Sequence, residues 1–289
     1  MGLETGAGGS GAGILYVAAS PLGNLGDVSH RLERVLREVA VVAAEDTRRT
    51  RKLLSHLDAH PRLLSYHAHS EPGREEELMR VLEDGESVAL VTDAGTPAVS
   101  DPGSRLVARA RATGVHVVPI PGPSAVIAAL SVSGLSADRF TFLGFLPRGG
   151  AERRRMLATV RESPWTVVLF EAANRLAKLL RDLIDEGLAD RHGAVARELT
   201  KVHEEVQTGT LVGLEGYYRD HPARGEVTVV VTGGPAAVRK RPPVADHETV
   251  AARARQLVRE GASRRDAAAR LAQELNLSRN DAYRVVASL

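Results

Sequence analysis

The polar groups best placed to contact a ligand lie in three loops that contain glycine and proline. SPLGNLGD (20–27), DAGTPAVSDPG (93–103) and PGPSA (121–125) each follow an apolar segment. Glycine lets a backbone approach a ligand closely, and the loops after parallel strands gather at one edge of a sheet, where ligands bind. The three loops together predict one shared ligand cleft. None has the G-x-G-x-x-G spacing, so the sequence does not support a dinucleotide site of the Rossmann type.

Two aspartates of the second loop receive different interpretations. Asp93 closes an apolar strand, and it is expected either to form an Asx-turn or to contact the ligand. Asp101 precedes Pro102 and a helical pattern. It is therefore predicted to be the N-cap of that helix, with the proline at the first helical position.

Apolar strands alternate with amphipathic helices through the first half of the chain. The predicted strands are 14–19, 41–45, a short segment around LLSYH, 87–93 and 115–120, and helices are expected after Asp27, from about Asp46, and over 75–83, 102–112 and 124–132. This alternation is typical of a mostly parallel sheet covered on both faces. We predict an α/β domain over 14–134, preceded by a disordered Gly-rich tail over 1–13.

A second set of strands and helices begins at FTFLGFLP (140–147). The segments TVVLFEA, AVARELT and GEVTVVVTGG are the other predicted strands, with helices near 151–162 and 174–186. They predict a smaller α/β domain over 135–234. A charged linker that contains proline follows over 235–247, and then a helical tail over 248–289. That tail resembles a helix-turn-helix, with a turn at Asn276 and Ser278 as a plausible N-cap.

Composition excludes several classes of protein. The chain has 289 residues, 43% of them hydrophobic, but no run of eighteen apolar residues and no signal-peptide pattern at its start, so a cytoplasmic protein with no membrane association is expected. The absence of cysteine excludes disulfides, a thiolate metal site and a cysteine nucleophile. A net charge of +2 neither requires nor forbids nucleic acid, so the distribution of charge matters more than its sum.

Eight sequence blocks, in order, carry a resemblance to a known family. They are LYVAASPLGNLGDVSHRLERVL, AAEDTRRTRKLL, SYHAHSE, VTDAGTPAVSDPG, IPGPSA, FLGFLP, ARELTK and GEVTVVV. Together they resemble the bacterial ribosomal RNA 2'-O-ribose methyltransferases of the tetrapyrrole methylase superfamily, over residues 14 to about 232. The chain departs from that pattern at Ala68, where the family tends to have an acidic residue, and at Ala172-Ala173-Asn174, where it tends to have Ser-Pro-His.

The resemblance implies two α/β domains with S-adenosylmethionine bound in the cleft between them, a homodimer, and 16S ribosomal RNA of the small subunit as partner. The cofactor contacts, carried over by position and mostly made by backbone and apolar groups, would be Leu22, Gly23, Asp93, Ala94, Gly95, Thr96, Val99, Ser124, Ala125, Phe170, Ala196 and Thr228.

Methyl transfer to a ribose hydroxyl needs alignment of donor and acceptor, and a general base would accelerate it further. The candidates for that base are Glu45, Asp46, His67, His69 and Glu71, and Glu45 and Glu71 are preferred because they have weaker structural explanations. Asp46 is expected to cap the following helix instead. His67 and His69 lie near Glu71 in the sequence, but without further ligands no metal site is predicted.

Basic residues form the predicted RNA contacts. The cluster on one predicted helix consists of Arg48, Arg49, Arg51 and Lys52, and Arg48 lies one turn from Glu45. Further clusters occur at 148–155, 239–241 and 264–265. Each cluster alone is equally compatible with a solvated face. With 3% aromatic residues, few platforms for base stacking exist, so the shape and phosphates of a structured RNA are the expected recognition features.

Three functions remain open at this point. The favoured one is ribose methylation of ribosomal RNA. The second is C-methylation of a corrinoid precursor, which would not need the basic block EDTRRTRKLL, and the third is a nucleic-acid binder without enzymatic activity that reads its target with the C-terminal tail.

Overall fold

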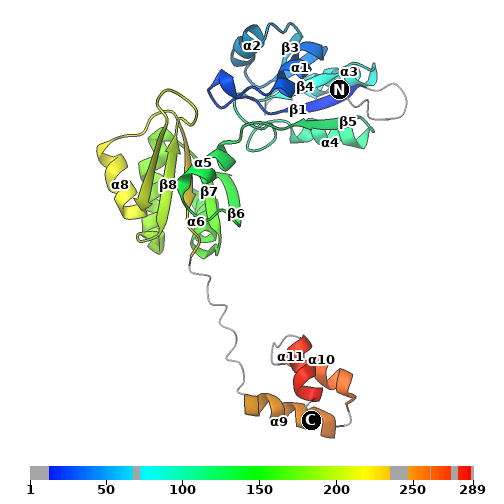
Figure 1. The fold of residues 1–289 in the computed structure, drawn as a ribbon, viewed down its shortest axis with the longest axis vertical. Helices are drawn as coiled ribbons and strands as arrows, with labels where there is room; N and C mark the ends of the chain where they lie inside the picture. The colour runs from blue at the N-terminus through cyan, green and yellow to red at the C-terminus, as the bar shows by residue number, and fades with distance from the viewer. Residues whose placement is uncertain (1–12, 68–71, 235–246, 261, 275–278, 288–289) are drawn as a thin grey trace. The chain divides into compact units, whose positions relative to one another are not determined.

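The computed structural model describes residues 13–67, 72–234, 247–260, 262–274 and 279–287. The described residues up to Gly233 form one compact unit, and those from Gly234 form another. The first unit contains two five-stranded sheets (Figure 1).

The first sheet is parallel throughout, in the order β3-β2-β4-β1-β5. Its elements are β1 Ile14–Ala18, α1 His30–Glu38, β2 Val41–Ala44, α2 Thr47–His56, β3 Arg62–Ser65, α3 Pro72–Glu83, β4 Val88–Val91, α4 Ser104–Ala112 and β5 His116–Ile120. β2 and β4 are buried along their whole length, as strands covered on both faces must be. Helices α1 and α2 pack on one face, and α3 and α4 on the other. The predicted parallel α/β arrangement is confirmed.

Local signals explain where two of these helices begin. The Ser29 hydroxyl accepts a hydrogen bond from the Leu32 amide at the start of α1, and the Asp46 carboxylate accepts one from the Arg48 amide at the start of α2. The predicted capping role of Asp46 is confirmed.

The predicted capping role of Asp101 is wrong. α4 begins at Ser104, and its N-cap is Gly103, which makes no side-chain capping bond. Gly103 has φ of +136°, and a Cβ there would lie 2.6 Å from Leu90 Cδ2. Only glycine fits this turn, so the helix starts at Ser104, three residues after Asp101, and the Asp101 carboxylate does not cap it.

The second sheet is mixed, in the order β6-β7-β10-β8-β9. The strands of this sheet and the helices around it are α5 Ala125–Ser133, β6 Phe140–Phe145, α6 Gly150–Glu162, β7 Thr166–Ala172, α7 Leu176–Leu183, β8 His192–Arg197, β9 Glu205–Thr210, α8 Leu211–Asp220 and β10 Glu226–Val231. β6 and β7 are parallel, whereas the other three pairings are antiparallel. The sequence patterns predicted a second set of strands and helices here, but they did not predict β9 or α8.

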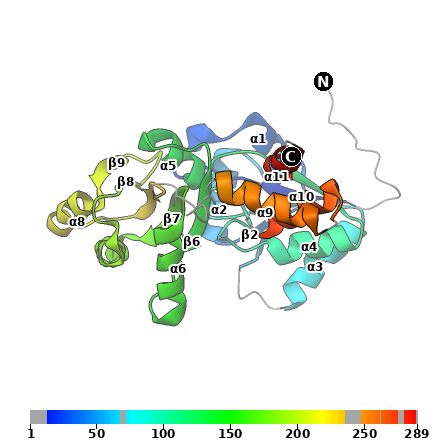
Figure 2. The same ribbon diagram turned by 90° about the horizontal axis from the view of Figure 1, so that it is seen from below.

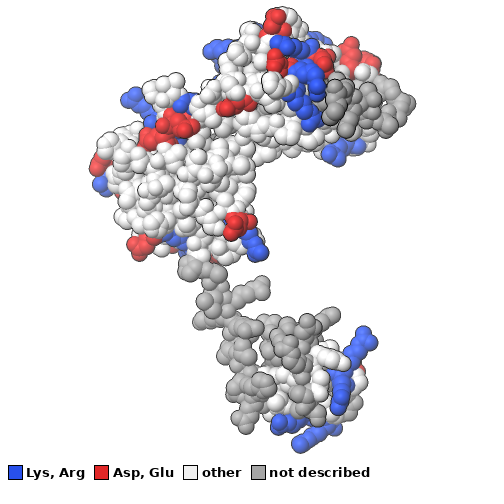
Figure 3. Space-filling model, in the orientation of Figure 1, with Lys and Arg blue, Asp and Glu red and all other residues white. Residues whose placement is uncertain are grey.

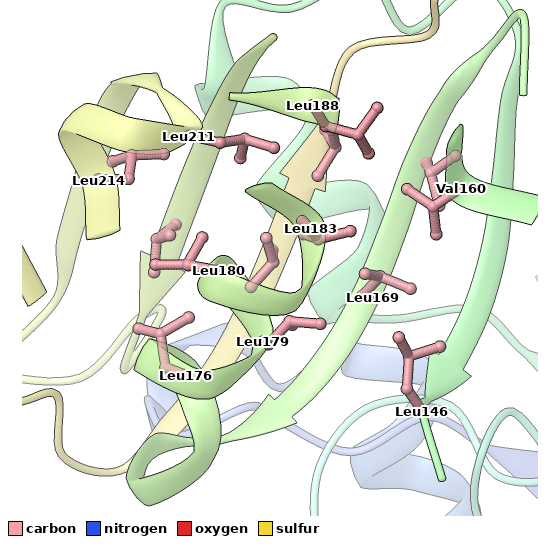
Figure 4. Close-up of a cluster of buried hydrophobic side chains, with 14 of the residues drawn as sticks. Leu146, Val160, Leu169, Leu176, Leu179, Leu180, Leu183, Leu188, Leu211 and Leu214 are labelled. Atoms are coloured by element: carbon pink, nitrogen blue, oxygen red, sulfur yellow. The ribbon is translucent and has the colours of Figure 1, made fainter. Parts of the chain in front are cut away.

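Each face of the second sheet has its own apolar core. Leucines of α6, α7 and α8 pack on one face, which Figure 4 shows around Leu179 and Leu180. α5 covers the other face, and Figure 2 shows α5 and α6 on opposite sides of the sheet. The α5 cluster also includes Leu22, which follows β1, so an apolar core joins the two sheets.

The C-terminal unit consists of α9 His247–Arg259, α10 Arg264–Glu274 and α11 Arg279–Ala287. Small apolar residues of all three helices, including Ala254, Ala267 and Ala282, form its core. The predicted helical tail is confirmed, while the predicted turn at Asn276, the cap at Ser278 and the tail over 1–12 lie outside the described residues. No described helix is both long and apolar enough to cross a bilayer.

Leu179 tests the core of the second sheet. Its side chain is fully buried, so Leu179→Ala removes packed methyl groups and should lower the free energy of unfolding by about 2–5 kcal/mol. Urea denaturation measures this change. Val212→Ala, at a position that is 51% exposed on α8, is the control and should change stability by less than about 0.5 kcal/mol. Equal effects of the two substitutions would contradict the described packing.

Candidate active site

A cavity of about 800 Å³ lies between the carboxyl edge of the first sheet and the second sheet. Loops after β1, β2 and β4 and the start of α5 supply one wall, and β7, β8, β10 and adjoining residues supply the other. Its volume falls within the range of small-molecule sites. The predicted convergence of the loops at one edge is therefore present in the structure.

Backbone hydrogen bonds hold the loops after β1 and β4 together. The amide of Ser20 donates to the carbonyl of Gly95 at 2.8 Å, and the amide of Gly95 donates to the carbonyl of Ser20 at 3.0 Å. Gly95 has φ of +83°, a conformation that glycine adopts without strain. The Thr96 hydroxyl, next along the chain, donates to the carbonyl of Pro123 at 3.4 Å. These bonds join all three glycine-containing loops.

Three carboxylates line the cavity at this edge: Glu45, Asp93 and Asp101. The Thr92 hydroxyl donates to Glu45 Oε2 at 2.6 Å, and the Asp93 amide approaches the same oxygen at 3.4 Å. The Asp46 amide donates to Asp93 Oδ1 at 3.0 Å. The first two carboxylates are thus fixed by hydrogen bonds.

Burial, together with the proximity of these acids, raises the pKa values of two of them. Burial, followed by the charges of Glu45 and of neighbouring acids, raises the pKa of Asp101 to about 6. Burial and the Glu45 carboxylate also raise the pKa of Asp93. Like charges in a partly desolvated cluster disfavour full ionisation, and a cationic ligand would relieve this repulsion.

Arg49 spans the cavity between the two sheets. Its guanidinium lies 3.6 Å from Asp93 and 4.0 Å from Glu226 at the start of β10. The sequence places Arg49 in the basic cluster of α2, as a candidate RNA contact, and does not predict its contacts with acids of both sheets. Its position three residues beyond the Asp46 cap was the available signal.

Most of the predicted cofactor contacts line the cavity. These are Leu22, Asp93, Ala94, Ala125, Phe170, Ala196 and Thr228. Of the other predicted contacts, Gly23 lines a separate small hollow, and Gly95 and Thr96 hold the loops together. Val99 is 42% exposed, and Ser124 is the N-cap residue of α5 without a side-chain capping bond.

The predicted catalytic and RNA-binding residues have different outcomes. Glu45 lines the cavity, whereas Glu71 lies outside the described residues. Arg48 is 85% exposed at its side chain and pairs with Asp46 at 2.8 Å. Arg51 and Lys52 are exposed on the same helix.

Glu171 is a further acid in the cavity lining that sequence reasoning missed. Its side chain is fully buried and pairs with Arg175 at 3.1 Å, while its Oε2 has no hydrogen-bond partner in the described structure. A lone glutamate inside the apolar strand TVVLFEA was the signal for it.

Comparison with known proteins places the chain in a family. Residues 14–215 match the model of the tetrapyrrole (corrin/porphyrin) methylases, and the chain belongs to this family of methyltransferases. A protein of Synechocystis sp. named ribosomal RNA small subunit methyltransferase I is 42% identical over 94% of this chain and 97% of its own length. A protein of Xylella fastidiosa with the same name is 48% identical over 76% of this chain and 82% of its own length.

Solved structures support the same fold. Cobalt precorrin-4 methyltransferase, a cobalamin biosynthetic enzyme, aligns with a TM-score of 0.59 and 19% identity over 76% of this chain and 94% of its own. Uroporphyrin-III-C-methyltransferase from Thermus thermophilus aligns with a TM-score of 0.56 and 20% identity, over 79% of this chain and 97% of its own.

The methyl donor of this protein is S-adenosylmethionine. The cavity fits that molecule because Leu22, Phe145 and Phe170 offer apolar surface, while the Asp93 and Asp101 carboxylates face the same space. Acids of this kind favour the positive charges of a sulfonium and an ammonium group. When bound, the donor supplies an electrophilic methyl group.

Gly95 tests this placement. A Cβ at this position would lie 3.4 Å from Leu22 Cδ2 and would force a side chain into a left-handed conformation, so Gly95→Val should displace the loop and weaken binding of S-adenosylmethionine at least about tenfold. Titration calorimetry measures the affinity. Gly114→Val, also at positive φ but with open space around it, controls for backbone strain alone and should bind the donor as the parent does. Parent-like binding by a folded Gly95→Val variant would place the donor elsewhere.

Proposed function

We propose that this protein transfers a methyl group from S-adenosylmethionine to the ribose 2'-hydroxyl of a cytidine in 16S ribosomal RNA of the small subunit. The observation that carries the proposal is the 42–48% identity to proteins named ribosomal RNA small subunit methyltransferase I, which in one case extends over 97% of that protein. The ribose and cytidine specificity rests on the resemblance of the eight sequence blocks.

The cavity and its surroundings support an RNA substrate. Arg48, Arg51 and Lys52 present exposed cations on α2, which begins directly after the cavity residue Glu45. Separately, the C-terminal unit exposes Arg255, Arg259, Arg264, Arg265 and Arg270, and Figure 3 shows Lys and Arg side chains on its surface. Cations of this kind bind phosphates without reading sequence.

The proposed cofactor contacts are the predicted residues that line the cavity, with Gly95 and Thr96 fixing the loops. The donor would thus lie against apolar side chains and loop backbone, with the acids on the side where the methyl group leaves.

Methylation of a corrinoid precursor is the second candidate. The solved structures with this fold include enzymes of tetrapyrrole synthesis, but their identity of 19–20% supports the fold alone. The exposed cations of α2 favour RNA over a small tetrapyrrole. A nucleic-acid binder without enzymatic activity is disfavoured by the family and by the cavity.

We also propose a cytoplasmic homodimer. Ile127 and Val132 expose about half of their apolar side chains on α5, and such residues are candidates for a subunit interface. Light scattering on the purified protein determines the oligomeric state.

Labelled S-adenosylmethionine tests the proposed reaction. The protein is incubated with assembled small ribosomal subunits, with free ribosomal RNA and with a tetrapyrrole precursor, and the label is then mapped. Label at the 2'-oxygen of one cytidine, which blocks alkaline cleavage at that nucleotide, is expected. Label on the tetrapyrrole alone would support methylation of a corrinoid precursor. If no acceptor is labelled, the result would support a nucleic-acid binder without enzymatic activity.

Arg48 tests the RNA contact. Arg48→Glu should weaken RNA binding and reduce the slope of log affinity against log salt by about 1, because a phosphate contact is lost, while affinity for S-adenosylmethionine stays unchanged. Filter binding over a salt series measures both affinity and slope. Arg111→Glu, an exposed arginine in the last turn of α4, is the control for net charge. If the two variants lose RNA affinity equally, the effect of Arg48→Glu comes from net charge and not from a specific phosphate contact.

A further inference from the structure

A second hollow of about 440 Å³ adjoins the main cavity and is absent from the sequence-based predictions. The two spaces share Glu45, Ser100 and Asp101, so these three residues form a common wall. The hollow continues over Tyr66 and His67 after β3 to the first residues of α4. Its size is adequate for one nucleoside and falls in the range of small-molecule sites.

One buried acid contacts several polar side chains on the side of this hollow away from the main cavity. Glu75 is 7% exposed, and it pairs with Arg105 at 2.9 Å and Arg109 at 3.6 Å. The Tyr66 hydroxyl lies 3.5 Å from the same carboxylate. Of the two arginines, Arg105 lines the hollow, and its side chain is 75% exposed. Its guanidinium can therefore contact a phosphate of a nucleotide.

We infer that the second hollow receives the nucleotide to be methylated, and that Asp101 in the shared wall accepts the proton of its hydroxyl group. This inference rests on the proposed function. It places donor and acceptor in two adjoining spaces that meet at Glu45, Ser100 and Asp101, where the acceptor oxygen can reach the methyl carbon in line with the sulfur.

Asp101 is better suited than Glu45 to accept this proton. Glu45 already accepts the Thr92 hydroxyl at 2.6 Å and lies near the Asp93 amide, and these contacts hold its carboxylate in place. Asp101 lies among acids from three elements, Glu45 after β2, Asp93 after β4 and Glu226 on β10. A base is most effective when its pKa lies near the working pH. Glu45 becomes a positioning residue in this scheme.

The charged groups around Asp101 set its titration. Besides the three acids, Arg49 of α2 pairs with Asp93 and Glu226, while His67, Glu75 and Arg105 line the second hollow. Burial and the acids outweigh the hydrogen bond with the Thr92 side chain and raise the pKa of Asp101 to about 6. Its carboxylate form therefore predominates at neutral pH and remains basic enough to take a proton.

The step balances without another reactant. The hydroxyl oxygen forms a bond to the methyl carbon while the bond from that carbon to sulfur breaks, and the sulfur keeps the electron pair as a neutral thioether. The hydroxyl proton passes to the Asp101 carboxylate and then to water. Only unprotonated Asp101 can act, so the rate at subsaturating S-adenosylmethionine, which reports the free enzyme, should rise with pH, reach half its maximum near pH 6 and then level off.

Single-turnover methylation of small subunits over a pH series tests the role of Asp101. Asp101→Asn should lose about 10² or more in rate and lose the rising limb near pH 6, with affinity for S-adenosylmethionine within a few-fold of the parent. Glu45→Gln should keep that limb but move its midpoint to lower pH, because one acid that raises the pKa of Asp101 is gone. An Asp101→Asn variant with the parental pH profile would overturn the assignment.

A blocked hollow tests the acceptor site separately. Ser104 is exposed and lines the hollow, so Ser104→Trp should fill it without disturbing the core and should raise the KM for subunits at least about tenfold, with donor affinity unchanged. Ala112→Trp, exposed at the other end of α4, is the matched control and should behave as the parent. A parental KM for Ser104→Trp would place the nucleotide elsewhere. Failure of the parent itself to methylate RNA would instead contradict the proposed function.

Discussion

The convergence of parallel strands at one sheet edge is the constraint on which the rest of this structure depends. Because β1, β2, β4 and β5 are parallel, all their following loops meet at the same edge. The paired Ser20 and Gly95 backbones then fix the loops after β1 and β4 against each other. This edge closes against the second sheet through the apolar cluster around Leu22, and the cavity results from that closure.

The same strand geometry gathers acidic side chains in this cavity. Glu45 and Asp93 follow neighbouring strands, so the fold forces their carboxylates together, and the backbone returns to them at Asp101 after positive-φ residues at Ala98 and Ser100. Such a cluster costs stability when empty because its members repel one another in a partly desolvated space. It suits a cationic methyl donor and, in our proposal, keeps one carboxylate basic near neutral pH.

The sequence predicted the sheet edge because strand alternation and glycine-containing loops are local signals. It predicted the capping of α2 by Asp46 for the same reason. It failed at Asp101, because Asp-Pro is typical of a helix start and the positive φ of Gly103 becomes necessary only when Leu90 packs beneath it. It missed β9, whose mixture of Thr, Gly and Gln lacks an apolar alternation, and it could not show that Arg49 spans two sheets or that Tyr66 and Glu75 line one hollow with Asp101.

The most direct test of this account is a crystal structure of the protein with S-adenosylhomocysteine and a short RNA that carries the acceptor nucleotide. The account predicts the sulfur of the product in the larger cavity, the ribose in the smaller hollow, and the Asp101 carboxylate within hydrogen-bond distance of the 2'-oxygen, about 2.6–3.2 Å. Binding of S-adenosylhomocysteine away from the loops after β1 and β4, or of the ribose away from the wall formed by Glu45, Ser100 and Asp101, would contradict it.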